Sequence, residues 1–522
     1  MRAIDYFDKG ADDYPDRIAI VDGDICCTYR ELRDASERIA RAIWAMGLKE
    51  EDRVAIYSPN DARVLVCMLG IMRAGGAWVP ISYRNASDAN VSFMKYAEIF
   101  CLFYHSSFRE QAEDLRSRVP SLRHSVCLDR EFGDDPSLEQ FMERGNGVQE
   151  KEWADSRGNP ERMVGLVPTG GTTGPAKGVR VQNSSWGAYA EMAAHYWRCE
   201  GVDPVCLSTA PLSHAAGVFA FAMFSLGVTN VIMPRFDALE VLRNIERFRI
   251  THLFLPPTAF YALLAHPEVK KHDYSSLRVL LLAGSPVSPD RLKKGVQVFG
   301  PCICQCYGQT EAPMLLTWLD AKTVAAAAGG AHPERLRSCG KATYAVRLAT
   351  MDEHGNLLPA NQIGEIVARG ALVTAGYHNM PEATAEIRTH GWHHTGDIGY
   401  KDEDGYFYIV DRKKDMIITG GFNVYAAEVE SAIMALPGVQ ECGVIGVPDE
   451  KWGEAVKAVV VLHDGESLTE KEIIEYCKAK LGGVKSPKSV EFRAEIPKTS
   501  AGKMDRKVLR SPYWVGTDRA VH

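Results

Sequence analysis

A recurring order of amphipathic helix and short apolar run constrains the fold of this chain more than any other feature. Apolar residues recur at helical spacing over Leu32–Met46, and the apolar run Val54–Tyr57 follows. The same order returns at Val241–Phe248 and Thr251–Leu255, with a further apolar run at Leu277–Leu282. Helices alternating with buried strands are typical of parallel sheets covered by helices. We therefore expect an α/β fold with a large N-terminal domain of mostly parallel sheets.

The length of 522 residues is sufficient for more than one domain. The charged segment Asp411–Asp415 separates two apolar runs, so we interpret it as a solvated linker. Beyond it, an apolar helix face including Val429 and Ile433 and a capping-box pattern at Thr469 and Glu472 indicate a small α+β module. These features predict an N-terminal domain at 1–411 and a C-terminal domain at 412–522.

Composition excludes several classes of protein. Apolar residues make up 46% and charged residues 24%, and the net charge of -7 is spread along the chain, which argues against a nucleic-acid binder. The 13 cysteines include no Cys-x-x-Cys pair, and the N-terminus has no apolar signal core, so a cytoplasmic location is expected. The segment Pro204–Pro234 has no charged residue, yet Ser, Pro, His, Gly and Asn residues interrupt it. We expect a strand, loop and buried helix there and no integral membrane segment.

A glycine- and hydroxyl-rich segment covers Pro168–Gly178, with the sequence PTGGTTGPAKG. Glycines allow successive backbone N–H groups to converge on an anion, hydroxyls add donors, and a lysine adds charge. The pattern differs from the P-loop of kinases and GTPases, because its lysine lies between Ala176 and Gly178. We predict a phosphate-binding loop made of Thr169, Gly170, Gly171, Thr172, Thr173, Gly174 and Lys177.

Further motifs follow this loop in a fixed order. They are APLSHAAG, LLAGSPVS, QCYGQTEAP, GEIVARG, GWHHTGDIGY, DRKKDMIITGGFNVYAAEVE and PKTSAGKMDRK. Together with the loop, they resemble the adenylate-forming superfamily, which includes acyl-CoA synthetases and other AMP-dependent synthetases and ligases. The resemblance extends from about Thr28 to Arg506 and is greatest to bacterial fatty- or aryl-acid CoA ligases.

The resemblance implies an ATP-dependent acyl-CoA ligase. Such an enzyme forms an acyl-AMP intermediate and then a coenzyme A thioester, and it uses ATP, Mg²⁺, coenzyme A and a small-molecule carboxylic acid; we expect a monomer or homodimer. A stand-alone acyl-AMP ligase that loads a carrier protein is the alternative. An ester hydrolase would need a Gly-x-Ser-x-Gly elbow, which the sequence lacks. A catalytically inactive acyl-binding protein would be expected to lack Lys177, Glu311 or Lys503, and all three are present.

Nucleotide-binding roles follow from the resemblance. Glu311 is the implied magnesium ligand, and Thr310 would donate to phosphate. Asp397 would accept hydrogen bonds from the ribose hydroxyls, with Arg412 as a donor to the same sugar. The adenine site is implied to contain Gln305 at the base edge, the Tyr307 ring, Gly308, and a facing wall of Gly284, Ser285 and Pro286.

The C-terminal domain is implied to move. Lys503 would reach the α-phosphate and acyl oxygens during adenylation, and Lys414 occupies the hinge position. Rotation about this hinge would remove Lys503 before a thiol attacks the adenylate. The implied coenzyme A residues are Gly420, Gly421, Trp452 and Lys488.

An apolar acyl pocket is also implied. Its residues are Met192, His214, Ala215, Ala216, Ala283, Cys306, Gly308 and Met314, and His214 could close over the carboxylate. No charged residue is available in this set to pair an amino group, so a neutral-tailed acid is expected, whether fatty, aryl or alicyclic. The alternating Cys302, Cys304 and Cys306 are expected to be buried on a strand rather than to bind a metal.

Overall fold

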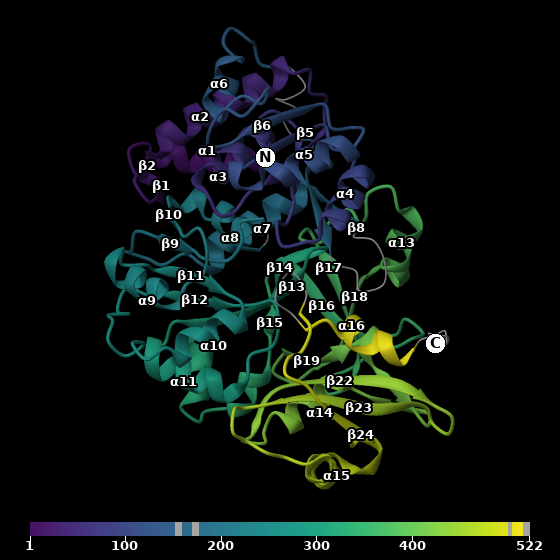
Figure 1. Ribbon diagram of the computed structural model, residues 1–522. Helices are drawn as coiled ribbons and strands as arrows, with labels where there is room; N and C mark the ends of the chain where they lie inside the picture. Colours follow the sequence, from purple (N-terminus) through teal and green to yellow (C-terminus); the bar gives the residue numbers. More distant parts are fainter. Residues whose placement is uncertain (152–158, 170–176, 214, 499–503, 515–522) are drawn as a thin grey trace. The chain divides into compact units, whose positions relative to one another are not determined.

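The computed structural model describes residues 1–151, 159–169, 177–213, 215–498 and 504–514 (Figure 1). The chain forms two compact units. The first contains most of the chain up to Leu348, together with Ala368–His393. The second contains Ala349–Val367 and the residues from His394 onward.

One sheet of the first unit has a parallel centre. Strands of this centre, such as β12, are apolar and buried along their whole length, which is typical of a parallel sheet covered on both faces. The parallel strands in spatial order are β1 (Ile18–Asp22), β10 (Thr229–Ile232), β9 (Val205–Ser208), β11 (His252–Leu255), β12 (Val279–Leu282) and β13 (Ile303–Gln309). Antiparallel strands flank them: β2 (Ile25–Thr28) on β1, and β14 (Ala312–Leu319) followed by β15 (Gly340–Ala342) on β13.

Helices connect and cover these strands, as the α/β prediction requires. Helix α9 begins after Asp237, whose side chain accepts a hydrogen bond from the backbone N–H of Glu240, and α9 precedes β11 as predicted. Helices α9, α10 and α11 flank β9, β11 and β12 (Figure 1). The helices are α7 (Asn183–Tyr196), α8 (Ala215–Ala222), α9 (Ala238–Arg247), α10 (Pro257–Ala265), α11 (Pro289–Phe299) and α12 (Ala321–Ala328).

The uncharged segment Pro204–Pro234 forms strand β9, helix α8 and strand β10. Within the described residues, no helix has both the length and the apolar character needed to cross a membrane. The expected strand, loop and buried helix are therefore confirmed.

A second sheet of the first unit is also mostly parallel. Helix α2 supplies the predicted amphipathic pattern and starts with a capping box between Thr28 and Glu31. The strands in spatial order are β6 (His124–Cys127), β5 (Cys101–Tyr104), β3 (Arg53–Tyr57), β4 (Ala77–Pro80), β7 (Met163–Thr169) and the antiparallel β8 (Lys177–Gln182). The helices are α1 (Ala3–Asp13), α2 (Tyr29–Ala45), α3 (Ala62–Arg73), α4 (Ser87–Tyr96), α5 (Arg109–Arg118) and α6 (Leu138–Glu143).

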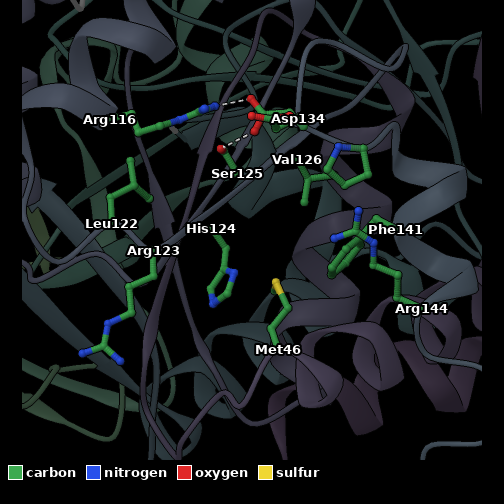
Figure 2. A pocket seen from close by; sticks show the side chains of 12 residues that line it. Met46, Arg116, Leu122, Arg123, His124, Ser125, Val126, Asp134, Phe141 and Arg144 are labelled. Carbon is green, nitrogen blue, oxygen red and sulfur yellow. Dashed lines mark hydrogen bonds and ion pairs between the residues drawn. The ribbon is translucent and has the colours of Figure 1, made fainter.

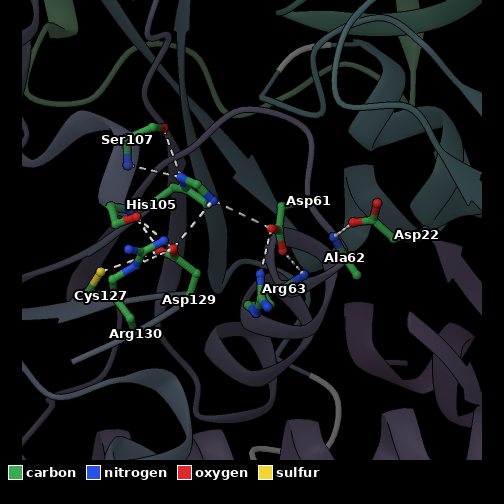
Figure 3. Close-up of polar contacts among 10 residues, drawn as sticks. Asp22, Asp61, Ala62, Arg63, His105, Ser107, Cys127, Asp129 and Arg130 are labelled. Carbon is green, nitrogen blue, oxygen red and sulfur yellow. Dashed lines mark hydrogen bonds and ion pairs between the residues drawn. The ribbon is translucent and has the colours of Figure 1, made fainter. Parts of the chain in front are cut away.

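Polar side chains join the loops at the carboxyl ends of three of these strands (Figure 3). Asp61 follows β3, His105 follows β5, and Asp129 follows β6. The His105 Nε2 lies 3.9 Å from Asp129 and 4.0 Å from Asp61, and Asp129 accepts a 2.8 Å hydrogen bond from the backbone N–H of Ser106. Strand β7 is parallel to β4, so its last residue, Thr169, lies at this same edge of the sheet. In open α/β sheets, this is the edge that binds ligands.

The second unit contains most residues of two groups of strands. One has the order β16 (Val346–Met351), β17 (Gly364–Gly370), β18 (His393–Lys401) and β19 (Tyr406–Arg412). The other has the order β21 (Phe422–Val424), β20 (Ile417–Thr419), β23 (Gly453–Leu462) and β22 (Val439–Asp449), with β24 (Ser489–Phe492) on β23. Helix α15 (Glu470–Lys485) begins at the predicted capping box. Helices α14 (Ala426–Ile433) and α16 (Arg506–Arg510) complete the expected α+β module, and α13 (Pro381–Glu386) belongs to the first unit.

The expectation of a solvated segment over Asp411–Asp415 is wrong at its first residue. Asp411 lies in β19, is 5% exposed, and accepts hydrogen bonds from the backbone N–H groups of Arg412 (2.7 Å) and Ala427 (3.1 Å). Burial raises the pKa of Asp411 to about 6. The exposed part of the segment is therefore Arg412–Lys414.

Candidate active site

Glu311 lies at the tight turn between the antiparallel strands β13 and β14. The pairing shifts register between Tyr307 and Gln309, which marks a bulge. Gly308 is required there, because a Cβ atom on it would lie 2.3 Å from the backbone nitrogen of Met314. The bulge and turn bury Glu311, which is only 8% exposed.

The segment Thr374–His378 holds Glu311 in place. The hydroxyl of Tyr377 donates a 2.7 Å hydrogen bond to Glu311 Oε1. The N–H and hydroxyl of Thr374 both donate to the backbone carbonyl of Glu311, at 2.9 and 3.0 Å. Burial, reinforced by the Glu311 charge, raises the pKa of Tyr377, so this phenol remains a donor at neutral pH.

Lys177 lies near the aromatic ring of the same tyrosine. Its Nζ is 4.8 Å from the centroid of the Tyr377 ring, within the range of a cation–π interaction. Backbone hydrogen bonds from Arg180 to Gly376 (2.9 Å) and from His378 to Gly178 (2.8 Å) pair this segment with β8. Tyr377 thus connects Lys177 with Glu311, two residues that the sequence analysis assigned to phosphate and magnesium.

Thr169 and Lys177 are register partners across β7 and β8. The other predicted loop residues lie outside the described part of the chain, as do two further predicted residues. These are Gly170, Gly171, Thr172, Thr173 and Gly174 of the loop, together with His214 and Lys503.

The predicted adenine residues meet at the carboxyl ends of β12 and β13. Gln305 pairs with Leu282 in the neighbouring strand, and the exposed Gly284–Pro286 follows directly after β12. Among the described residues, the buried Nε2 of Gln305 has no hydrogen-bond partner. A buried amide without a partner carries a large desolvation cost, which a ligand acceptor would offset. Tyr307 and Thr310 lie half-buried on the same hairpin.

Most of the predicted acyl residues are buried. The hydroxyl of Tyr189 lies 3.3 Å from the sulfur of Met314, and the hydroxyl of Thr343 lies 3.4 Å from the sulfur of Met192. Met192, Ala216, Ala283, Cys306 and Met314 are all buried, and Ala215 begins α8. Cys302, Cys304 and Cys306 are buried as expected, and burial raises the pKa of each thiol.

The predicted ribose residues come together in the second unit. Asp397 and Arg412 are register partners across β18 and β19, and their side chains lie 3.3 Å apart. Asp397 is buried whereas the Arg412 side chain is 44% exposed. Strand β18 runs through Thr395–Asp397.

The profile of the AMP-binding enzyme family matches residues 7–378, and the profile of the AMP-binding enzyme C-terminal domain matches residues 428–503. This chain belongs to the AMP-binding enzyme family. This AMP-binding enzyme is 42% identical over 516 residues to the medium/long-chain-fatty-acid–CoA ligase FadD8 of Mycobacterium tuberculosis. The match covers 96% of this chain and 88% of FadD8. It is 34% identical to a feruloyl-CoA synthase of Amycolatopsis, with 96% of each chain covered.

Structural comparison agrees with the sequence comparison. The crystal structure of ATP-bound MatB from Rhodopseudomonas palustris has a TM-score of 0.86 and 29% identity, and the match covers 98% of this chain and 99% of MatB. The chain is an AMP-forming acyl-CoA ligase.

Glu311 of this AMP-binding enzyme is suited to a magnesium ion. Its Oε1 accepts the hydrogen bond from Tyr377, and among the described residues its charge acts on Arg388 without an ion pair within 4 Å. The described residues contain no group of three or more His, Cys, Asp or Glu that could enclose a metal. Magnesium at sites of nucleotide chemistry is commonly held by one or two carboxylates plus substrate phosphates, and Glu311 fits this arrangement.

The predicted coenzyme A residues of the AMP-binding enzyme fall into two groups. The backbone N–H of Gly420 donates a 2.8 Å hydrogen bond to Trp452, and a Cβ atom on Gly420 would lie 2.5 Å from the indole. Gly421 is exposed beside them. Lys488 lies elsewhere, where its Nζ donates a 2.6 Å hydrogen bond to Gly483.

A separate cavity of about 240 Å³ lies in the first unit, between β6, α6 and the end of α2 (Figure 2). None of the predicted site residues lines it. One of its arginines, Arg116, is paired with Asp135, which also accepts a 2.7 Å hydrogen bond from Ser125. The cavity is therefore distinct from the candidate active site.

The sequence analysis did not identify Thr374, Tyr377 or Arg388 as site residues. Arg388 donates a hydrogen bond to the Thr374 carbonyl, and burial lowers the pKa of Arg388 although Glu311 and Tyr377 act in the opposite direction. Tyr377 lies 66 residues from Glu311, and neither residue carries a local signal of their contact.

Proposed function

We propose that this ligase activates a neutral-tailed carboxylic acid in two steps. In the first, a carboxylate oxygen attacks the α-phosphorus of ATP, an acyl-phosphate bond forms, and pyrophosphate leaves. In the second, the thiolate of coenzyme A attacks the acyl carbon, the thioester forms, and AMP leaves with the oxygen that had bound phosphorus. The grouping of Glu311, Tyr377 and Lys177 is the observation that carries the proposal.

The first step brings two anions together. Their repulsion at a separation of 4 Å amounts to about 4 kcal/mol at an effective dielectric of 20. Lys177, at the start of β8, supplies a cation to the phosphates, and Thr310 on the hairpin supplies a hydroxyl donor. Magnesium bound through Glu311 would screen the phosphate oxygens and stabilise the charge on departing pyrophosphate.

The nucleotide base is proposed to bind beside β13. The unpaired Nε2 of buried Gln305 supports a role in reading the adenine edge. Tyr307 would contact the ring, with Gly308 and Gly284–Pro286 around it. In the second unit, the buried carboxylate of Asp397 remains the candidate acceptor for ribose hydroxyls, with Arg412 as the donor beside it.

The acid is proposed to be fatty, aryl or alicyclic. Met192, Ala216, Ala283, Cys306 and Met314 are buried and apolar, and they would provide a lining with no charge for an amino group. The two curated relatives named above are, by their names, ligases of fatty and aryl acids, which supports this range. His214 remains the candidate that closes over the carboxylate.

A change of domain position is proposed to separate the two steps. The domain boundary would fall between residues 411 and 412, with Lys414 as the hinge. Lys503 would serve adenylation, and Gly420, Gly421, Trp452 and Lys488 would then serve coenzyme A. Lys503→Ala should block adenylation yet preserve thioester formation from supplied acyl-adenylate; equal loss of both steps would contradict this division of roles.

Substrate assignment requires a panel of fatty, aryl and alicyclic acids. Purified enzyme with ATP, magnesium and coenzyme A should release pyrophosphate with at least one acid, and mass spectrometry should detect its coenzyme A thioester. An acid that supports pyrophosphate release but yields thioester only on a carrier protein would favour a carrier-loading ligase. Absence of pyrophosphate release with every acid would contradict the proposed function.

A further inference from the structure

Tyr377 makes two different contacts with two different charged residues. Its hydroxyl donates to Glu311 Oε1 at 2.7 Å, and its ring lies 4.8 Å from the Lys177 ammonium. One contact uses the phenolic proton and the other uses the aromatic face. The two contacts can therefore be removed separately by substitution.

The backbone around Tyr377 is fixed by its own contacts. Gly376 has a φ of 104°, and a Cβ atom on it would lie 2.3 Å from the methyl group of Thr384, so only glycine fits. The Tyr377 N–H donates a 3.0 Å hydrogen bond to the Thr384 hydroxyl. Pairing with β8 on one side and the Thr374 hydrogen bonds to Glu311 on the other complete this support. The backbone that carries the Tyr377 side chain is thus held in position by contacts within the protein.

The arrangement keeps two opposite charges apart. A flexible lysine near a buried carboxylate would otherwise gain from a direct ion pair, and the pair would neutralise both groups. Here Glu311 forms no ion pair with a described cation, since the phenol satisfies Oε1 without bringing a positive charge. Oε2 is left available for a cation, and Lys177 is held on the ring face.

We propose that Tyr377 is a positioning residue that orients Glu311 for magnesium and holds Lys177 for the ATP phosphates. This rests on the proposed function of the site. The hydroxyl sets the magnesium demand, which is the magnesium concentration needed for half-maximal activity, because it fixes the carboxylate orientation that binds the ion. The ring sets the affinity for ATP, because it holds the ammonium away from Glu311.

Two substitutions separate these roles. Tyr377→Phe keeps the ring and removes the hydroxyl, so the magnesium concentration for half-maximal pyrophosphate release should rise about tenfold. Its KM for ATP at saturating magnesium should stay within about twofold of the wild-type value. Tyr377→Leu removes both contacts, so both quantities should rise, each by about tenfold or less.

Tyr96 provides a matched control. Its hydroxyl donates to the backbone carbonyl of His378, next to Tyr377, and its described hydrogen bonds and ring contacts involve neither Glu311 nor Lys177. Tyr96→Phe should leave the magnesium demand and the KM for ATP unchanged. Thermal melting of all three variants shows whether each is folded, and Tyr377→Leu provides the magnesium test if Tyr377→Phe is not.

Wild-type magnesium demand in the folded Tyr377 variants would overturn the proposal. An equal rise in magnesium demand in Tyr96→Phe would also overturn it, because the effect would then arise from a general loosening of the segment. Failure of the proposed function itself has a different signature, since wild-type enzyme would then release no pyrophosphate with any acid.

Discussion

The hairpin that carries Glu311 and the segment that carries Lys414 are stabilised in different ways. Glu311 is buried and held by neutral donors, the Tyr377 hydroxyl and the N–H and hydroxyl of Thr374. In the second unit, Arg412 and Lys413 are exposed and held by ion pairs to Asp397 and Glu365, at 3.3 and 3.1 Å. Neutral buried contacts hold the carboxylate rigidly without an ion pair, whereas exposed ion pairs exchange at little cost.

After the exposed residues, a cluster of charged side chains holds the second segment in place, and we call this cluster the rigid anchor. Arg506, at the start of α16, contacts Glu430 at 2.6 Å and Asp415 at 3.4 Å. Burial lowers the pKa of Arg506, but the surrounding carboxylates outweigh it and raise the value overall. The exchangeable part of the second segment is therefore confined to Arg412–Lys414, in contrast to the preorganised site around Glu311.

Glu311→Gln should have the largest effect. The amide keeps the shape and loses the charge that binds magnesium, so pyrophosphate release should fall by about 10³-fold. A stopped assay of pyrophosphate with the best acid measures this. Glu382→Gln on exposed α13 is the control and should keep full activity; a Glu311→Gln variant with more than a tenth of wild-type activity would remove Glu311 from the magnesium role.

Arg506→Ala should reduce stability by about 2 kcal/mol, because the carboxylates of Glu430 and Asp415 would remain together without their cation. Urea unfolding followed by circular dichroism measures the loss. Arg493→Ala removes an arginine that pairs with the half-buried Glu491 and should change stability by less than about 1 kcal/mol. Equal effects of the two substitutions would contradict the buried anchor.

Asp411 should produce a pH dependence of stability. Burial raises its pKa to about 6, above the unfolded value near 4, so the folded chain retains this proton to higher pH. The resulting contribution is present at low pH and is lost as pH rises through about 6. Relative to Asp411→Asn, the wild-type free energy of unfolding should fall by about 1 to 2 kcal/mol between pH 5 and 7.5. Parallel curves for the two proteins would show that Asp411 is not buried as a carboxyl group.

Lys413→Ala should have the smallest effect. The Lys413 side chain is 61% exposed, and its ion pair to Glu365 is worth less than about 1 kcal/mol. Glu365 keeps His394, at 3.1 Å, and the N–H of Gly396, at 3.0 Å. A decrease of 2 kcal/mol or more in the free energy of unfolding, measured with urea, would show that Lys413 contributes as much to stability as the rigid anchor.

Local sequence patterns predicted most of the fold. The helix before Gly47, the strand Val54–Tyr57 and the capping box at Thr469 depend on contacts within a few residues, and all three are present. Burial of Asp411 was not predictable, because it depends on Ala427 and Arg506. Charge is a weak guide to exposure when the compensating groups lie far away in sequence.

The candidate site was predictable only in part for the same reason. Glu311, Gln305 and Asp397 lie in motifs with recognisable spacing. Tyr377 lies 66 residues from the carboxylate that it contacts, and its segment approaches both Glu311 and Lys177 only through long-range pairing. Motif reasoning finds the groups that perform chemistry more readily than the groups that hold them.

The fate of the carboxylate oxygen tests the central claim most directly. An acid from the panel, labelled with ¹⁸O in its carboxyl group, is converted with ATP and coenzyme A. The masses of the products are measured by mass spectrometry. Acyl-adenylate chemistry predicts one ¹⁸O atom in each AMP and none in pyrophosphate, because the oxygen that attacks the α-phosphorus leaves with AMP. AMP without label, or label in pyrophosphate, would contradict an acyl-adenylate intermediate.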